Sequence, residues 1–241
     1  MDDRGRSIAV MQPYIFPYLG YFQLINAVDE FVFYDDVNFI KQGWINRNQI
    51  LNNNKALSFS IPLKKVSSFE TIQGTKINFN LYAKWKKKFL KTLEQNYYKA
   101  PYFESIYDIV HEIIEDPKSE SISELAIRSN VYISNYLGLK AKFKKSSEYF
   151  YNSKKLERTE RLLNIGNKLK AKAYINALGG QELYDKSDFK ACGIELLFLK
   201  PNLKSYKQFS EEFVSGLSII DVLMFNNKKD CMELLNDYKL V

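Results

Sequence analysis

The opening of the chain constrains the fold most, because it alternates in the order of a parallel α/β unit. Residues 7–13 (SIAVMQP) form a short apolar run that is broken by Pro13, as is typical of a buried strand. Residues 20–28 (GYFQLINAV) carry apolar side chains at helical spacing, and residues 30–36 (EFVFYDD) form a second apolar run that ends in two carboxylates. A strand, a helix and a second strand in this order predict an α/β fold with a parallel sheet.

The same alternation returns in the second half of the chain. The lysine-rich stretch KAKFKKSSE (140–148), which ends in two serines, and two apolar runs alternate with helical patterns there. They bring the expected strands to five, at 7–12, 30–35, 141–145, 172–176 and 194–199. We therefore expect an α/β fold built on a Rossmann-like open parallel sheet of about five strands. Residues 216–238 are expected to be helical around the apolar stretch LSIIDVLMF.

The middle of the chain interrupts this pattern. Alternating apolar residues between 56 and 65 and a short run at 74–80 predict strands. Amphipathic or capped segments predict three helices, at 82–97, 102–116 and 121–137. We expect a single domain over residues 1–241, with an α/β core from 7–50 and 140–227 and a β-rich plus helical insertion at 51–139.

Two residue patterns predict the ends of the third of these helices. Ser121 is followed three residues later by Glu124, which is the pattern of a capping box. Gly138 follows the last apolar residue and is a typical C-cap.

Polar and glycine residues follow the expected strands at the point where each strand ends. In an open parallel sheet, ligands bind outside the carboxyl ends of the strands. We therefore expect a binding site at this edge, drawn from Gln12, Tyr14, Asp35, Asp36, Ser146, Asn176, Gly179 and Gly180.

The turn after the first expected strand is rich in proline and tyrosine. Gly20 permits a close backbone approach at the start of the first helix, where free N–H groups favour an anion. Tyr14, Tyr18 and Tyr21 offer hydroxyl donors and ring faces to a substrate. The spacing Tyr18-Leu-Gly-Tyr21 stands where nucleotidylyl transferases carry His-x-Gly-His, but without the histidines. A rigid aromatic turn that packs on the core explains the same residues.

The charged residues near this edge have two interpretations each. Asp35 or Asp36 could orient a sugar hydroxyl, hold a metal or act as a base, or one of them could merely cap the next turn. In WINRNQI (44–50), Asn46 and Arg47 follow a tryptophan. Arg47 suits a phosphate or a carboxylate ligand, or it pairs structurally with one of the two aspartates.

The glycine pair in NALGGQELY (176–184) could let the backbone cradle a phosphate or an acyl group, or could simply form a tight turn.

His111 is the only histidine and lies in a helical stretch, which disfavours Ser–His and Cys–His triads and a histidine zinc site. Neither Cys192 nor Cys231 has metal-ligand spacing, so we expect no metal site.

Composition narrows the class of protein. The chain carries 35 lysines and arginines against 28 aspartates and glutamates, a net charge of +7 that suits an anionic partner. The lysines are scattered, so we expect no stable nucleic-acid partner. No apolar run approaches the ~18 residues of a spanning helix, and the opening MDDRGRSIAV lacks the apolar core of a secretory signal. We expect a cytoplasmic protein without a transmembrane segment.

Several stretches, in order along the chain, resemble the WbqC-like protein family. They are MQPYIFPYLGYFQLINAVDEFVFYDDVNFIKQGWINRNQIL, YYKAPYF, YINALGGQELY, and GIELLF and LSIIDVLMFN, each with the phenylalanine before it. They run from residue 8 to about 227, nearly the whole chain. Members of that family are usually encoded among bacterial O-antigen, capsule or other surface-glycan genes, often near amino-sugar enzymes. The resemblance implies work on a nucleotide-linked or lipid-linked sugar, but it carries over no catalytic residue.

The most concrete hypothesis from this resemblance is an enzyme that transfers an acyl or aminoacyl group to the amine of a nucleotide-linked amino sugar. In that hypothesis Asp35 or Asp36 deprotonates the amine or orients the sugar, and Asn176 with the Gly179–Gly180 backbone stabilises the oxyanion. The expected substrate-binding residues besides the glycine pair are Gln12, Tyr14, Tyr18, Gly20, Tyr21, Asn46, Arg47 and Ser146.

The donor in this hypothesis is a coenzyme A or carrier-protein thioester, or an aminoacyl donor. The expected partners are a nucleotide-linked sugar and, for a carrier-bound donor, an acyl-carrier protein. Two alternatives stay open. One is nucleotidylyl or adenylyl transfer at a degenerate His-x-Gly-His site with ATP or CTP and magnesium. The other is a non-catalytic binding protein of a glycan-assembly complex.

Overall fold

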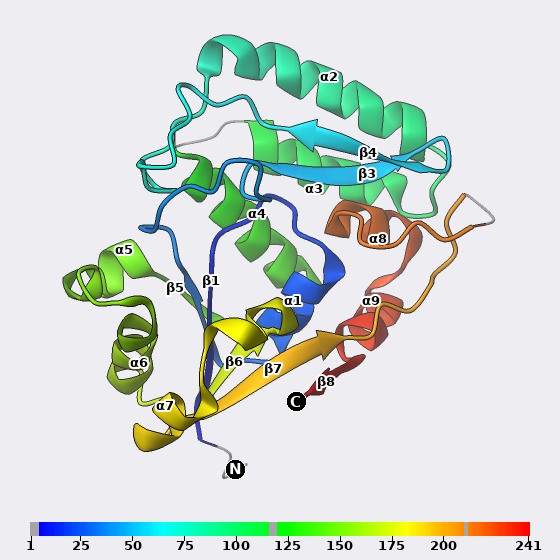
Figure 1. Ribbon diagram of the computed structural model, residues 1–241. Coiled ribbons are helices and arrows are strands. Elements are labelled where there is room, and N and C mark those ends of the chain that lie inside the picture. Colours follow the sequence, from blue (N-terminus) through cyan, green and yellow to red (C-terminus); the bar gives the residue numbers. More distant parts are fainter. Residues whose placement is uncertain (1–4, 116–119, 210–211) are drawn as a thin grey trace.

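The computed structural model describes residues 5–115, 120–209 and 212–241. Its centre is a six-stranded sheet in the order β5–β2–β1–β6–β7–β8 (Figure 1). The strands are β1 (Ser7–Met11), β2 (Glu30–Phe33), β5 (Lys142–Lys145), β6 (Ala173–Ala177), β7 (Glu195–Pro201) and β8 (Tyr238–Leu240). The first five strands are all parallel to one another, whereas β8 runs antiparallel to β7. The α/β prediction and the five parallel strands are confirmed, and β8 is a strand that the sequence pattern does not predict.

The alternation of side chains along the strands gives the sheet two apolar faces. Ile8, Tyr174 and Leu196 are register neighbours across β1, β6 and β7 and point to the same face. There they form one apolar cluster with Leu162 of α6 (Arg158–Lys168) and Phe189 of α7 (Lys186–Ala191). This face therefore belongs to the helices that connect β5 to β6 and β6 to β7.

The opposite face carries the larger core. Ala9 and Phe33 pack there with Ile25 of α1 (Leu19–Asn26), Ile133 of α4 (Ile122–Leu137) and Leu235 of α9 (Lys228–Leu235). All five side chains are fully buried or nearly so, at 0–1% exposed. Helices thus contribute to the core on both sides of the sheet, as expected for a largely parallel sheet.

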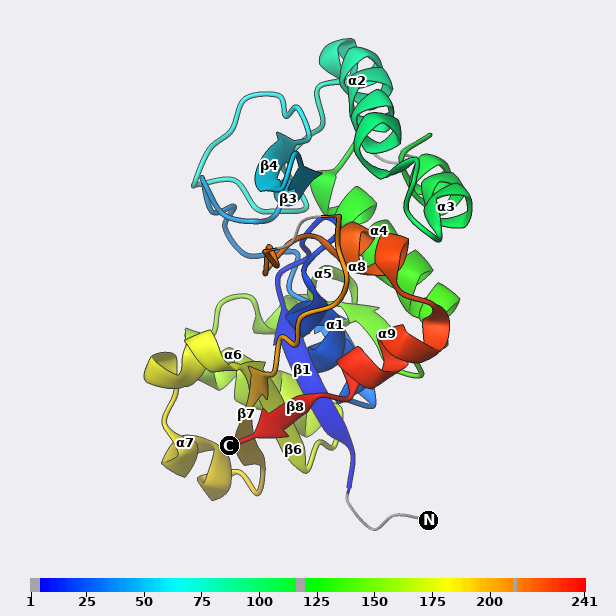
Figure 2. The same cartoon turned by 90° about the vertical axis from the view of Figure 1, so that its right-hand side faces the viewer.

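The segment between β2 and β5 holds a hairpin and three helices. β3 (Arg47–Asn52) and β4 (Lys55–Ser60) pair antiparallel, and the turn between them uses two asparagines with positive φ. α2 (Phe79–Tyr97), α3 (Phe103–Glu115) and α4 confirm the three expected helices. The expected helix end at residue 116 lies outside the described residues. In both views the hairpin and α2 lie at the opposite end of the molecule from the N-terminus (Figures 1 and 2).

One strand prediction in this segment is wrong. Residues 74–80 make only isolated bridges, Lys76 with Ser121 and Ile77 with Leu63, and α2 already begins at Phe79. Apolar and polar side chains alternate there, but the backbone forms single bridges to two separate segments. A strand ladder with either segment therefore does not form.

The predicted ends of α4 are partly confirmed. Ser121 is the N-cap, and its side chain accepts a hydrogen bond from the Ser123 N–H. Glu124 does not complete a capping box, because its carboxylate instead accepts from Lys145 Nζ at 2.8 Å. Gly138 ends the helix in the left-handed region, at φ 76°, as predicted.

The C-terminal segment is only partly helical. α8 (Ile219–Phe225) and α9 are separated at Asn226, and β8 follows α9. Two short helices and a strand thus replace the continuous helical stretch expected over 216–238. Within the part of the chain that the structure describes, no helix is long and apolar enough to cross a membrane.

Candidate functional site

The order of the strands reverses direction between β1 and β6, which makes this junction the topological switch point of the sheet. From β1 the chain adds β2 and then β5 on one side, and it adds β6 and then β7 on the other. Gln12 follows β1, and Asn176 lies near the end of β6. This junction is where an open α/β sheet places a ligand.

Asn176 offers a free hydrogen-bond donor at this junction. Its side chain is buried, and its Oδ1 accepts from the Ala177 N–H at 2.9 Å. Its Nδ2 has no hydrogen-bond partner within the described ranges. A Cβ at Gly180 would lie 2.5 Å from that Nδ2, whereas a Cβ at Gly179 would meet nothing within 4 Å. Gly180 therefore permits the η2 backbone (Leu178–Leu183) to lie against the carboxamide, and Gly179 faces open space.

Two of the predicted tyrosines hold Gln12. The Tyr21 hydroxyl donates to Gln12 O at 2.8 Å, and the Tyr14 hydroxyl lies 3.5 Å from Gln12 Oε1. Burial raises the pKa of Tyr21 well above its ordinary value, and burial with the neighbouring Tyr18 raises the pKa of Tyr14. These hydroxyls therefore stay neutral, and Gln12 Nε2 is left without a partner among the described residues.

Tyr18 and Gly20 lie against one another. A Cβ on Gly20 would approach the Tyr18 ring to 2.4 Å, so the glycine makes room for this ring rather than for a ligand. Burial also raises the pKa of Tyr18. The start of α1 is thus covered by an aromatic side chain.

The aspartate pair lies between β2 and β5. Asp35 is 1% exposed, and it accepts from the Ser147 N–H (3.0 Å), the Ser147 hydroxyl (2.6 Å) and the Ser146 hydroxyl (3.1 Å). Ser146 and Ser147 are the first residues of α5 (Ser146–Tyr149), so Asp35 caps this short helix. Asp36 accepts from the Ser146 hydroxyl as well. Asp35 therefore caps a helix that begins 111 residues later in the chain, and not the turn directly after β2.

Asp36 has a buried cationic partner that sequence reasoning missed. Arg161 is 3% exposed, and its guanidinium donates to Asp36 Oδ2 at 2.6 Å. It also lies over the Tyr34 ring, 4.6 Å from the centroid, and donates to Ser153 in η1 (Tyr151–Ser153) at 3.3 Å. The sequence does offer one signal that Arg161 is buried, because it lies four residues before Ile165, on the apolar face of α6. Arg161, and not Arg47, is the structural partner of the pair, and each of the four carboxylate oxygens accepts a hydrogen bond.

Arg47 lies instead in a hollow of about 270 Å³ beside the hairpin. Its Nε is buried without a hydrogen-bond partner, its terminal nitrogen donates to Gln42 O, and its guanidinium lies 5.3 Å from the Trp44 ring centroid. Lys41 and Asn46 line the same hollow, and no carboxylate of the described residues lines it. Two positive charges therefore face this space without an acidic neighbour.

The hollow is tied to the turn after β1. Ile15 N–H donates to Ile45 O at 3.1 Å, and the Asn48 carboxamide donates to Phe16 O at 2.7 Å and Ile15 O at 3.2 Å. Phe16 has a positive φ of 42°, a strained conformation for an aromatic residue. The Ser218 hydroxyl also donates to Phe16 O, at 2.8 Å. The hairpin is therefore fixed against the carboxyl edge of the sheet.

Another buried carboxylate, one that the sequence analysis did not single out, fixes the other end of the hairpin. Asp221 accepts from the Tyr97 hydroxyl (2.8 Å), the Tyr206 hydroxyl (2.6 Å) and Gln208 Nε2 (2.7 Å). The Tyr97 hydroxyl in turn accepts from the Leu51 N–H of β3 at 2.7 Å. Burial raises the pKa of Asp221, despite the three donors that lower it.

Other candidates for metal or thiol chemistry are weak. Within the described ranges, no three His, Cys, Asp or Glu side chains group so as to hold a metal ion. His111 lies 3.2 Å from a Glu115 oxygen on the exposed side of α3. Cys192 is exposed, whereas Cys231 is buried and burial raises its pKa to about 12.

The sequence of the chain matches a protein family and a protein from another organism. The model of a family described as the WbqC-like protein family matches residues 12–233. Rv1507c of Mycobacterium tuberculosis, described as an uncharacterized protein, is 30% identical over 223 residues, covering 92% of this chain and 94% of that protein. No solved structure matches the chain.

Proposed function

This chain belongs to the WbqC-like protein family, and we propose that it is an enzyme of bacterial surface-glycan biosynthesis. In the proposed reaction it transfers an acyl or aminoacyl group to the amine of a nucleotide-linked amino sugar. The glycan context comes from the resemblance. The two parts of the substrate are assigned from the geometry at the hairpin and at the carboxyl edge.

The observation that carries the proposal is the uncompensated positive charge at Arg47. A buried N–H donor normally has a hydrogen-bond partner, because an unpaired one loses its hydration without compensation. Arg47 has a buried, unpartnered Nε, and Lys41 in the same hollow has no ion pair within the described residues. A planar guanidinium beside a second cation suits a diphosphate. We assign this hollow to the diphosphate of a nucleotide-linked sugar.

The acyl group is assigned to the junction between β1 and β6. There Asn176 Nδ2 and the backbone beside Gly179 offer neutral donors to the oxyanion that develops on an attacked carbonyl. The sugar amine attacks the thioester carbonyl carbon, a C–N bond forms, the C–S bond breaks, and the thiol leaves with the proton that the amine loses. Because both aspartates are fully hydrogen-bonded, we assign them to holding α5 and α6 and not to deprotonating the amine.

The same proposal includes a Rossmann-like sheet. With the parallel strands numbered along the chain, their order is the one that doubly wound nucleotide-binding folds use, with the first strand at the centre. The central strand, β1, has β2 and β6 as its neighbours. Arg161 lies beside Asp36, just after β2, and Asn176 lies near the end of β6, at the edge where such folds bind.

The test is a thermal-shift series followed by a transfer assay. A UDP- or dTDP-linked amino sugar at 100 times its dissociation constant should stabilise the fold by about 2.7 kcal/mol. Arg47→Gln should abolish that shift and the shift with the free nucleoside diphosphate. Gly180→Ala, which displaces the Asn176 carboxamide, should lower the rate of N-acylation at least about tenfold while keeping the shift. Asn176→Asp, which keeps the size of the side chain but replaces the Nδ2 donor with an oxygen, should lower the rate in the same way while keeping the shift.

Different outcomes contradict different parts of the proposal. A shift that persists in Arg47→Gln removes the diphosphate assignment. Binding without acyl transfer from any thioester or aminoacyl donor favours the non-catalytic alternative, which the saturated hydrogen bonding of Asp35 and Asp36 already supports. Nucleotidylyl transfer is the weaker alternative, because neutral Tyr18 and Tyr21 supply no positive charge to a phosphoryl transition state.

A further inference from the structure

One edge of the main sheet is covered over only part of its length. β8 pairs with Leu199–Pro201 of β7, and Val241 exchanges two backbone hydrogen bonds with Phe198, at 2.9 and 3.0 Å. Glu195 N–H points the other way and donates to the segment that leads into β6, at 2.8 Å. Because backbone groups alternate along a strand, the N–H and C=O of Leu196 point outward with those of Phe198. No strand within the described residues pairs with them.

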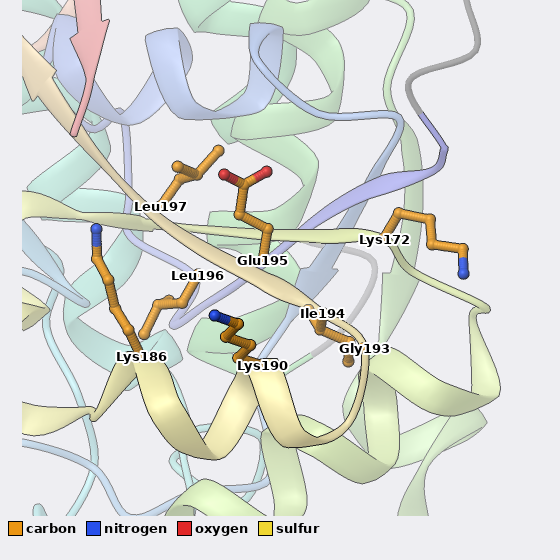
Figure 3. A pocket seen from close by; sticks show the side chains of 8 residues that line it. All are labelled: Lys172, Lys186, Lys190, Gly193, Ile194, Glu195, Leu196 and Leu197. Carbon is orange, nitrogen blue, oxygen red and sulfur yellow. The ribbon is translucent and has the colours of Figure 1, made fainter.

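A hollow of about 440 Å³ opens along this uncovered stretch (Figure 3). In this view β7 passes in front of β6, so the open edge faces the reader. Lys186 and Lys190 extend from α7 toward β7 beside Leu196, whereas Lys172 points away and Glu195 points to the other face of the sheet. Neither Lys186 nor Lys190 makes an ion pair with a described residue. This face of the edge is therefore positive.

A second hollow, of about 420 Å³, lies on the opposite face of the same edge. It shares Lys172, Glu195 and Leu197 with the first hollow. Ile175 and Leu240 give it an apolar lining beside Leu197. The two hollows thus flank the same short length of unpaired backbone, the first with lysines and the second with aliphatic side chains. The carboxylates of Asp29 and Glu195 also line the second hollow, so a carboxylate of the ligand is favoured only on the α7 face.

We propose that this edge binds an extended acidic segment of a partner protein as an added β-strand. Main-chain hydrogen bonds to Leu196 hold such a strand, and side chains that alternate between its faces give specificity. The residue opposite Leu196 points to the α7 face, where Lys186 and Lys190 favour a carboxylate. The residue opposite Leu197 points into the aliphatic hollow. The recognised pattern is therefore an acidic residue next to an apolar one.

Charge makes a second copy of this chain a poor occupant. If two copies paired antiparallel along this edge, their α7 helices would lie on the same face and bring Lys186 and Lys190 of both copies together. The net charge of +7 adds to this repulsion. The opposite edge of the sheet differs, because β5 (KFKK) places lysines along the strand itself, a common protection against strand addition. The β7 edge has no such lysine in Glu195–Leu197.

The experiment uses the full chain and short fluorescent peptides in which glutamate alternates with valine. We expect the glutamate peptides to bind in an anisotropy titration, and lysine–valine peptides to bind at least about tenfold more weakly. Lys186→Glu with Lys190→Glu should reverse this preference. Lys154→Glu with Lys155→Glu, a charge change of equal size at exposed residues elsewhere, should leave it unchanged. Hydrogen exchange of the Leu196 amide should slow in the complex.

The proposal is overturned if no glutamate–valine peptide binds, if both peptide classes bind alike, or if the Lys186→Glu/Lys190→Glu variant keeps the wild-type preference. It is also overturned if the Leu196 amide exchanges at the same rate in the saturated complex, since binding would then not involve strand addition. A concentration-dependent dimer that protects Leu196 would identify a second copy as the occupant. None of these readouts depends on the proposed transfer reaction.

Discussion

Arg161 and Asp36 bury two opposite charges where β2 meets α6. Their side chains are each 4% exposed, and the 2.6 Å contact is supported by Ser146 on one side and Ser153 on the other. Removing one partner of such a pair leaves a charge without hydration or compensation. The remaining carboxylate would then keep the Ser146 hydroxyl as a donor but lose its ionic partner while still buried.

We expect Arg161→Met to lower the free energy of unfolding by about 3–5 kcal/mol. Arg161→Met combined with Asp36→Leu should recover a large part of that loss, because no unpaired charge remains. Urea denaturation monitored by circular dichroism measures both. Equal losses in the single and double variants would mean that packing, and not the buried charge, sets the cost.

Asp221 makes stability depend on pH in the opposite sense from most carboxylates. Burial raises its folded-state pKa above the ordinary 3.8, so the folded protein holds this proton more tightly than the unfolded chain does. As pH rises from 3.8 through the raised pKa, this group alone therefore lowers the free energy of unfolding. We expect wild type to lose stability relative to Asp221→Asn over that interval, measured by urea titrations at successive pH values. A constant difference between the two proteins across that range would show that the Asp221 pKa is not raised.

Sequence patterns can single out polar residues at strand ends, but they cannot show which distant side chains these residues contact. Asp35, Asp36 and Asn176 were recognised because each follows an apolar strand, a signal that lies within a few residues. Arg161 is 125 positions away from Asp36, and no local pattern reports which distant side chain a carboxylate meets. The sequence leaves open whether Arg47 binds a ligand or pairs with one of the aspartates, and only the placement of α6 beside the end of β2 shows that Arg161 is the ionic partner.

At the level of elements, Gly138 shows how a single backbone conformation ends a helix. Its φ of 76° lies in the left-handed region, and a Cβ there would meet nothing within 4 Å. A substitution thus tests the backbone alone, without a steric clash. We expect Gly138→Ala to lower the free energy of unfolding by about 1–2 kcal/mol in a urea titration. Gly179→Ala, at ordinary φ and equally open, is the control and should change stability by less than about 0.5 kcal/mol.

Strands and helices were predictable where their pattern is long or buried on both faces. Four of the five parallel strands carry continuous apolar runs, the exception being the lysine-rich β5, and α2 to α4 have clear amphipathic faces or caps. β8 has three residues, and its place beside β7 is decided by the position of α9 and not by its own sequence. Residues 74–80 resemble a strand, but their neighbours in space offer only single bridges. Tertiary context therefore decides the short elements.

Across the whole molecule, one apolar core joins the sheet to the segment inserted between β2 and β5. Phe33 of β2, Ile50 of β3, Leu93 of α2 and Ile133 of α4 belong to the same cluster. A single-domain organisation therefore remains our prediction. Both tryptophans, Trp44 and Trp85, lie in the segment between β2 and β5, so their fluorescence reports on that part alone.

If the core is one cooperative unit, tryptophan fluorescence and far-ultraviolet circular dichroism should give the same urea midpoint and the same slope. The shared cluster is the physical reason, because the hairpin and α2 cannot leave without exposing the apolar side chains that they bury within it. Free tryptophan analogue in the same urea series is the control for solvent effects on emission. A fluorescence midpoint at clearly lower urea would reveal an independently unfolding insertion.

The contrast between the two thiols gives the native chain one intrinsic point of attachment for a dye. Cys231 is 1% exposed and its pKa is raised to about 12, so at neutral pH it is sealed from alkylating reagents and almost wholly un-ionised. Cys192 is exposed and immediately precedes Gly193, which borders the lysine-lined hollow at the β7 edge. A maleimide fluorophore should therefore couple at a single position without mutagenesis, and its emission would change when a partner settles alongside that strand.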